Sequence, residues 1–252
     1  MLSPRIRPRP RQPCQRALRE IEDVPEQDSF AALADFDTPT LCNALDLLRP
    51  AREGVSFTTD RMIWARDDEP PMIGIAVTAT MRADVPPGWD AAEGAARRLA
   101  YWRYLAASPR PALLVAQDVS ARRGFGGIWG DVNAGIHQGL GLRGVVTDGA
   151  VRDLPLLPSG FGLLAGIVTP SHGHGHVMGW GEPVEVFGMR VTPGDVVHAD
   201  RHGAVAFPPA LLPDLPASAR RVQAKEALLL AATRGGATPE RLAAAFADAA
   251  KL

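Results

Sequence analysis

The chain has 252 residues, which is enough for one domain or two small ones. Its 27 basic and 28 acidic side chains leave a net charge of −1, so we expect no nucleic-acid partner and no membrane partner. No run of about 18 apolar residues is present, so we expect no transmembrane helix. The two cysteines, Cys14 and Cys42, lack a CxxC spacing. We therefore favour free thiols in a reducing cytoplasm, with one disulfide between them as the open alternative.

Residues 1–27 are rich in Arg and Pro and then in acidic side chains, and few apolar residues could anchor them. We expect a flexible arm, or one packed on a neighbouring subunit. Its RPRPR run could contact an anionic partner, but we favour a solvated tail. Residues 28–252 are predicted to form one domain that ends in helices.

The first predicted element after this arm is a helix with the sequence TPTLCNALDLL, residues 38–48, in which Thr38 can cap the helix and Pro39 suits its first turn. The segments that follow alternate between strand-like and helix-like composition. Strands are predicted at 72–81, 111–118, 142–149 with a turn after Asp148, 161–169 and, as short pieces joined by tight turns, within 184–208; helices are predicted at 90–107, 131–140, 216–234 and 239–250. Alternating strands and helices followed by a β-rich section predict an α/β fold with a mixed sheet.

Gly139, Gly141 and Gly144 spell G-L-G-L-R-G, a formal match to the dinucleotide-binding fingerprint. That fingerprint must follow a strand and open a helix, whereas these glycines follow a predicted helix and precede a strand. We therefore expect no nucleotide site. Gly139 and Gly141 are predicted to be helix C-caps with positive φ, and Gly144 to allow a close approach of helix and strand.

The helix that has a glycine-rich approach is predicted to start at Gly130–Asp131, after the loop RRGFGGIWG. The first amides of a helix have no partner within it and can bind an anion such as a carboxylate. Taken alone, Asp131 is as well explained as an N-cap.

Asp131, then twenty residues, then Arg152-Asp153 resembles the D-x20-R-D pattern of the RraA (regulator of ribonuclease activity A) family, which includes divalent-metal pyruvate aldolases. TPTLCNAL, GVVTDGAVRDL and the segment 181–208 are similar to other parts of that family. The resemblance covers about residues 30–230. It implies an α/β swivelling β/β/α-type sandwich with mixed sheets, assembled as a homotrimer or homohexamer, with active sites between subunits.

The resemblance also implies the site residues. Pyruvate-like 2-oxo acids would bind between the loop Gly130, Asp131, Val132, Asn133 and the side chain of Arg152. Asp153 would hold Mg²⁺ or Mn²⁺, and Glu226 of a neighbouring subunit is the nearest match for a second acidic metal ligand; a solvated helix face explains Glu226 equally well.

The chemistry of these residue types agrees with that implication. Cleaving the carbon–carbon bond of a 4-hydroxy-2-oxo acid leaves a pyruvate enolate, whose charge needs an iminium or a metal with cations. Only Lys225 and Lys251 are lysines, which argues against the iminium. Arg152 suits a bidentate carboxylate, and Asp131 could position or activate a water for proton transfer. We expect a metal-dependent lyase that releases pyruvate by retro-aldol cleavage, with oxaloacetate decarboxylation as a side activity.

Two features leave alternatives open. Family members often carry an acid just after the R-D pair, whereas residues 154–160 contain none, so a non-catalytic regulator that binds a ribonuclease or another protein is the alternative function. On a strand, His172, His174 and His176 would share one face and could bind a metal, whereas the glycines between them suggest a flexible loop; a strand lining the cleft is the interpretation we favour. His137 is predicted to face the core or an interface, and Asp200 and His202 to shape a turn.

Overall fold

A computed structural model describes residues 27–67 and 69–252. Its helices are α2 (Gln27–Ala31), α3 (Thr38–Leu48), α4 (Ala91–Ala106), α5 (Asp131–Gly139), α6 (Leu215–Thr233) and α7 (Pro239–Ala249), with 3₁₀ turns at Leu154–Leu156 and Pro209–Leu211. Its strands are β1 (Ser56–Phe57), β2 (Ile63–Trp64), β3 (Met72–Arg82), β4 (Ala112–Asp118), β5 (Leu142–Thr147), β6 (Ala150–Val151), β7 (Gly162–Ala165), β8 (Ile167–Val168), β9 (His176–Trp180), β10 (Val184–Val186), β11 (Met189–Val191), β12 (Val196–Asp200) and β13 (Gly203–Phe207).

The predicted mixed α/β fold is confirmed. Strands β3, β4, β5 and β7 run parallel at the centre of the main sheet, and antiparallel strands complete the order β1-β13-β12-β3-β4-β5-β7-β2. Strand β3 is long enough to pair with β12 along its first half and with β9 along its second half, with a bulge at Thr80/Met81. Two small sheets, β10-β11 and β6-β8, stand apart from the main one.

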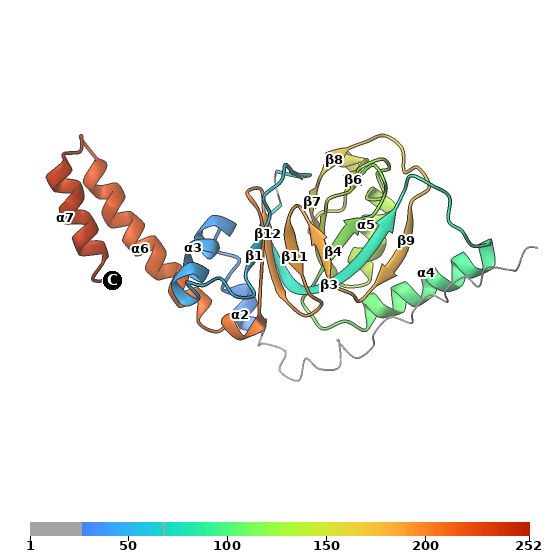
Figure 1. Ribbon diagram of the computed structural model, residues 1–252, viewed down its shortest axis with the longest axis horizontal. Helices are drawn as coiled ribbons and strands as arrows, with labels where there is room; N and C mark the ends of the chain where they lie inside the picture. The colour runs from blue at the N-terminus through green and yellow to red at the C-terminus, as the bar shows by residue number, and fades with distance from the viewer. Residues whose placement is uncertain (1–26, 68) are drawn as a thin grey trace, which may run out of the picture.

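Both faces of the parallel strands are buried, which explains their nearly continuous apolar sequences. Along β4, Leu114 and Ala116 face the core beneath α4 and α5, whereas Leu113 and Val115 face β10 and β11. A third apolar cluster packs α3 and α6 against β12 and β13. In Figure 1, α6 and α7 extend away from the sheet on the side opposite α5.

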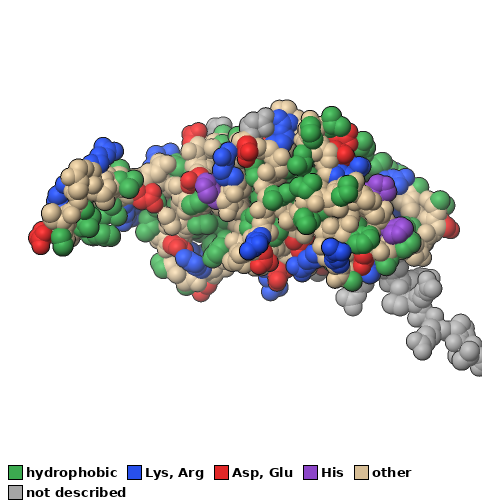
Figure 2. Space-filling view, turned by 90° about the horizontal axis from the view of Figure 1, so that it is seen from above, with side chains coloured by type: hydrophobic (Ala, Val, Ile, Leu, Met, Phe, Trp, Pro, Cys, Tyr) green, Lys and Arg blue, Asp and Glu red, His purple; other side chains and the backbone are tan. Residues whose placement is uncertain are grey.

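The molecular surface carries both signs of charge. On the face seen in Figure 2, basic and acidic side chains are interspersed over the sheet body. None of the described helices is long and apolar enough to cross a membrane. Cys42 is a half-buried free thiol, whereas Cys14 and nearly all of the expected arm lie outside the described residues.

The helix starts differ from expectation at α3. Asp37, rather than Thr38, is the N-cap, and its Oδ1 accepts a hydrogen bond from the Thr40 amide at 2.9 Å. Thr38 instead lies inside the fold, where its hydroxyl bonds to His198 Nδ1 at 3.0 Å and its amide donates to Asp200 Oδ2 at 2.8 Å. The sequence did not distinguish the two residues, because Asp and Thr are both favourable N-caps. The contacts of Thr38 with His198 and Asp200 leave Asp37 as the cap.

The glycine prediction is partly wrong. Gly141 does have a positive φ of 89°, but Gly139 is the last residue of α5 and has none. Gly144 lies in β5 opposite Gly162 of β7, and a Cβ on it would overlap the Gly162 carbonyl and the sulfur of Met72. The close approach is therefore between strands and not between a helix and a strand.

The predicted strand at 161–169 is two strands. Strand β7 stays in the main sheet, whereas β8 leaves it to pair in parallel with β6. The predicted strand face of alternating histidines is also wrong, since His172 and His174 lie in the turn before β9 and only His176 belongs to the strand. Asp200 ends β12 before the tight turn at His202, as expected.

The close contact of β5 with β7 at Gly144 can be tested by measuring the free energy of unfolding of glycine variants. Replacing Gly144 with Ala should lower the free energy of unfolding by about 1–3 kcal/mol, because the methyl group has no room. Replacing Gly139 with Ala is the matched control, since nothing lies within 4 Å of its added Cβ, and it should be neutral or stabilise α5 by up to about 1 kcal/mol. Urea unfolding of both variants measures this, and equal stabilities would contradict the strand-contact account.

Candidate functional site

A backbone bridge brings the start of α5 next to the Arg152-Asp153 pair. Trp129 and Val151 pair in parallel, and the Arg152 amide donates to the Trp129 carbonyl at 2.8 Å. Trp129 is fully buried beneath this bridge. The long segment between Gly130 and Arg152 therefore forms a closed loop of helix, strand and turn whose two ends touch.

Gly130 lies directly against the charged pair. A Cβ on Gly130 would overlap the Asp153 carboxylate and lie 3.2 Å from Arg152 Cγ. Arg152 Nη1 and Asp153 Oδ2 form an ion pair at 3.0 Å, with each side chain roughly a third exposed. Asp153 adopts the left-handed conformation, with φ 55° and ψ 35°, which directs the chain into the 3₁₀ turn that follows.

Several polar atoms of this site have no partner among residues 27–67 and 69–252. Arg152 Nε is buried and unbonded, and Asp153 Oδ1 accepts no hydrogen bond. The first-turn amides of Asp131 and Asn133 have no acceptor, because the helix offers none at its start. The site thus presents donors suited to a carboxylate beside one carboxylate oxygen suited to a cation.

The side chains of the other predicted loop residues, Asp131, Val132 and Asn133, point in different directions. Asp131 occupies the first helical position, and its Oδ1 accepts from the Val132 amide at 2.7 Å. Gly130, rather than Asp131, is the N-cap. The Val132 side chain is 66% exposed, and Asn133 turns back so that its Nδ2 donates to the Ile128 carbonyl at 3.2 Å. Gly130, Arg152 and Asp153 are in contact, whereas the side chains of Val132 and Asn133 point elsewhere.

Glu226 lies on α6, away from α5 in the same chain (Figure 1), and accepts a hydrogen bond from Asn43 Nδ2 at 3.2 Å. A role beside Asp153 would therefore require a second copy of the chain.

The carboxylates available at this site fit a metal ion that is bound partly by the protein and partly by the substrate. No group of three or more His, Cys, Asp or Glu side chains in the described part of the chain could hold a metal ion, and this includes the three histidines of 172–176. Asp153 offers the carboxylate that contacts Arg152 and lies against Gly130. Mg²⁺ is often held by one or two carboxylates, with water and substrate oxygens completing its shell, so the residues present fit Mg²⁺ or Mn²⁺ bound together with an oxygen-rich substrate.

Two buried acids that sequence reasoning missed hold the loop that leads to Gly130. Asp118 Oδ1 and Oδ2 accept from the amides of Ser120 and Gly124 at 2.9 and 2.8 Å, and Asp148 Oδ1 accepts from the Asp118 amide at 2.7 Å. Arg123 Nη1 lies 3.2 Å from Asp148 Oδ2. Their positions in the sequence were the available signal, because Asp118 is the last residue of β4 and Asp148 directly follows β5, the neighbouring parallel strand.

Burial raises the pKa of Asp148 to about 6 against an ordinary value of 3.8, and the Asp118 amide and Arg123 only partly oppose that effect. Asp148 thus carries a charge at neutral pH at a cost in stability.

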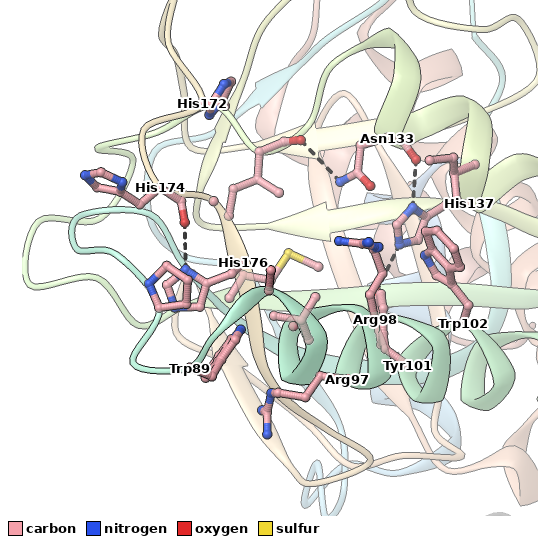
Figure 3. A pocket seen from close by; sticks show the side chains of 18 of the residues that line it. Trp89, Arg97, Arg98, Tyr101, Trp102, Asn133, His137, His172, His174 and His176 are labelled. Atoms are coloured by element: carbon pink, nitrogen blue, oxygen red, sulfur yellow. Dashed lines mark hydrogen bonds between the residues drawn. The ribbon is translucent and has the colours of Figure 1, made fainter.

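A cleft of about 710 Å³ opens between α4, α5 and the turn before β9. It takes in Asn133, Ile128 and the three histidines, together with side chains of α4 that the sequence did not single out (Figure 3). His137 lies at its base, 1% exposed as predicted, and burial lowers its pKa to about 4. It is therefore neutral, donates from Nδ1 to the Asn133 carbonyl at 2.7 Å and accepts at Nε2 from the Tyr101 hydroxyl at 2.9 Å.

The fold is a mixed α/β fold, and the site joins the Arg152-Asp153 pair to the start of α5 with several polar atoms left without partners. The Aldolase/RraA model of the RraA-like family matches residues 38–206, and the chain belongs to this family, which includes both aldolases and non-catalytic ribonuclease regulators. No curated protein matches it significantly.

Solved structures resemble the chain at low identity. An uncharacterized protein from Pseudomonas syringae pv. tomato str. DC3000 is 22% identical with a TM-score of 0.66, over 88% of this chain and 95% of that one. Streptomyces coelicolor RraAS2, described as an unusual member of the RNase ES inhibitor RraA protein family, is 23% identical with a TM-score of 0.62, over 81% of this chain and 97% of that one. These likenesses show the fold.

The raised pKa of Asp148 predicts that the stability of the fold depends on pH. The Asp148 carboxyl has a pKa of about 6 in the folded protein and an ordinary value of 3.8 in the unfolded chain. The fold is therefore most stable below about pH 4, where the carboxyl is protonated in both states, and it loses this stability as the pH rises through about 6. Asp148→Asn keeps the oxygen that accepts from the Asp118 amide and removes the charge. Between pH 4 and 7, wild type should therefore lose roughly 2–3 kcal/mol of unfolding free energy relative to this variant.

Urea unfolding of both proteins at each pH measures the difference. Asp195→Asn makes a comparison variant, since burial raises the Asp195 pKa at a position outside this loop. A constant difference between wild type and Asp148→Asn from pH 4 to 7 would show that the pKa of Asp148 is not raised.

Proposed function

We propose that the protein is a divalent-metal-dependent lyase that cleaves a 4-hydroxy-2-oxo acid by retro-aldol reaction and releases pyruvate. The observation that carries this proposal is the contact between Gly130 and the Arg152-Asp153 pair, with donors and a carboxylate oxygen left unpartnered. Membership of a family that includes aldolases supports it. Oxaloacetate decarboxylation passes through the same enolate and is the expected side activity.

Arg152 is assigned to the substrate. Its guanidinium is permanently charged, and the buried Nε and the free Nη positions can bind the C1 carboxylate of the oxo acid. The unpartnered amides at the start of α5 add donors and the positive end of the helix dipole. Both groups stabilise the negative charge that develops when the C3–C4 bond breaks.

Asp153 is assigned to the metal. When bound, Mg²⁺ or Mn²⁺ would act as a Lewis acid on the 2-oxo oxygen, where the electron pair of the broken bond accumulates. Asp153 holds its carboxylate in place through the ion pair of Oδ2 with Arg152, which leaves Oδ1 for coordination. Glu226 of a second copy, in a homotrimer or homohexamer, remains our candidate for a further acidic ligand.

Asp131 is assigned to proton transfer. Its Oδ1 is fixed by the Val132 amide on the first turn of α5, beside Gly130. A water held by this carboxylate would take the proton of the C4 hydroxyl as that carbon becomes a carbonyl, and a proton delivered to C3 completes pyruvate. Asn133 contributes through its unpartnered backbone amide, and Val132 contributes through the amide that holds Asp131.

The alternative function is a non-catalytic regulator that binds a ribonuclease or another protein. The absence of an acid at 154–160 is its support in the sequence. A regulator of this kind needs neither unpartnered donors at Arg152 nor a bound metal. An assay for metal-dependent release of pyruvate therefore distinguishes the lyase from the regulator.

The assay measures pyruvate released from 4-hydroxy-4-methyl-2-oxoglutarate, 4-carboxy-4-hydroxy-2-oxoadipate and oxaloacetate, with Mg²⁺, with Mn²⁺ and with EDTA. We expect turnover of at least one compound that EDTA abolishes and added metal restores. No metal-dependent turnover on any of them would refute the lyase and leave the regulator.

Variants locate the activity. Arg152→Ala should lower kcat/KM by about 100-fold or more, since it removes the main cationic donor. Gly130→Ala should also impair turnover, because its methyl group displaces the Asp153 carboxylate. Gly135→Ala on the same helix is the matched control, with nothing within 4 Å of its added Cβ, and should keep full activity. Full activity in Arg152→Ala would remove this site from the reaction.

A further inference from the structure

The cleft between α4 and the turn before β9 is a second candidate ligand site. Its volume of about 710 Å³ lies in the range of pockets that bind small organic molecules. Apart from Asn133, it shares no side chain with the Arg152-Asp153 site, so its role does not depend on the proposed lyase reaction.

Some of the charged side chains that line the cleft already have partners within the protein. Asp90 is the only carboxylate among the described residues that line it, and its Oδ1 accepts from the Glu93 amide at 2.9 Å as the N-cap of α4. Arg97 stacks over Trp89 with its Cζ 4.3 Å from the ring centre. Its Nη2 donates to the Met178 carbonyl at 2.8 Å. Both charges therefore already serve the local structure.

Arg98 remains available. It makes no hydrogen bond or ion pair with any residue in the described ranges 27–67 and 69–252, and its Cζ lies 5.7 Å from the ring centre of Trp102. In Figure 3 its guanidinium points into the cleft toward Asn133 and His137, whereas Arg97 turns toward Trp89. Because Asp90 caps α4 and no other carboxylate lines the described part of the cleft, Arg98 is a positive charge without a counter-ion that is aimed into the cleft.

The walls of the cleft are aromatic. Trp89, Tyr101 and Trp102 come from α4 and the segment before it, and His176 packs edge-on against Trp89 with ring centres 5.1 Å apart. Flat side chains of this kind favour a planar ligand, which can stack on their faces. A carboxylate on such a ligand suits the planar donor fork of an arginine.

We propose that this cleft binds a planar organic anion, an aromatic carboxylate, with Arg98 as its counter-ion and Trp102 and Trp89 as the walls against which its ring packs. The histidines of 172–176, which the sequence pattern singled out, line the end of the cleft away from Arg98 and His137 (Figure 3).

Isothermal titration calorimetry with three probes tests the ligand class. Benzoate is planar and anionic, benzamide is planar and neutral, and cyclohexanecarboxylate is anionic and not planar. We expect benzoate to bind at least tenfold more tightly than either of the others. No heat of binding with benzoate, or equal affinity for benzoate and benzamide, would overturn the proposal.

Variants test the place of binding. Arg98→Gln should weaken benzoate binding at least tenfold, and Arg98→Lys should recover part of that loss. Arg103→Gln is the matched control, since Arg103 is an exposed residue of the same helix outside the cleft, and it should bind benzoate as wild type does. Equal effects of Arg98→Gln and Arg103→Gln would show a general attraction of the anion to α4 and would refute a site at Arg98.

Discussion

The backbone bridge between Trp129 and Val151 is the contact on which the site depends. It joins Trp129, two residues before α5, to the end of β6, and the Arg152 amide donates to the Trp129 carbonyl. Because the bridge is made of backbone atoms and Trp129 is fully buried, it holds Gly130 against Arg152 and Asp153. Without it, the helix start and the charged pair would be two unrelated surface features.

The rest of the scaffold maintains this contact from both sides. On one side, Asp118 and Asp148 hold the glycine-rich loop at the ends of two parallel strands and place it before α5. On the other side, β8 leaves the main sheet and pairs with β6, the strand that ends directly before Arg152. Burial raises the pKa of Asp148, so its charged form is held at a cost in this arrangement.

Much of this could be predicted from sequence. Long elements of strand-like or helix-like composition, such as β3, α4 and α6, were predicted within one or two residues. The D-x20-R-D spacing predicted a site that joins the start of α5 to Arg152, and the structure brings Gly130 next to Arg152 and Asp153. The errors arose where a distant contact decides the outcome. Thr38 bonds to His198 rather than capping α3, and Gly144 meets β7 rather than a helix. The cleft at Arg98 combines α4 with a turn far along the chain, and no local pattern reports such a pairing.

The central claim is that Asp153 holds a divalent metal together with an oxygen-rich ligand at Gly130 and Arg152. Water-proton relaxation with Mn²⁺ tests it most directly, using oxalate as a planar mimic of the pyruvate enolate. We predict that oxalate tightens Mn²⁺ binding to the wild-type protein at least tenfold, and that Asp153→Asn, which tolerates the same left-handed backbone, loses this effect. Mn²⁺ binding that oxalate does not change, or that survives undiminished in Asp153→Asn, would contradict the account.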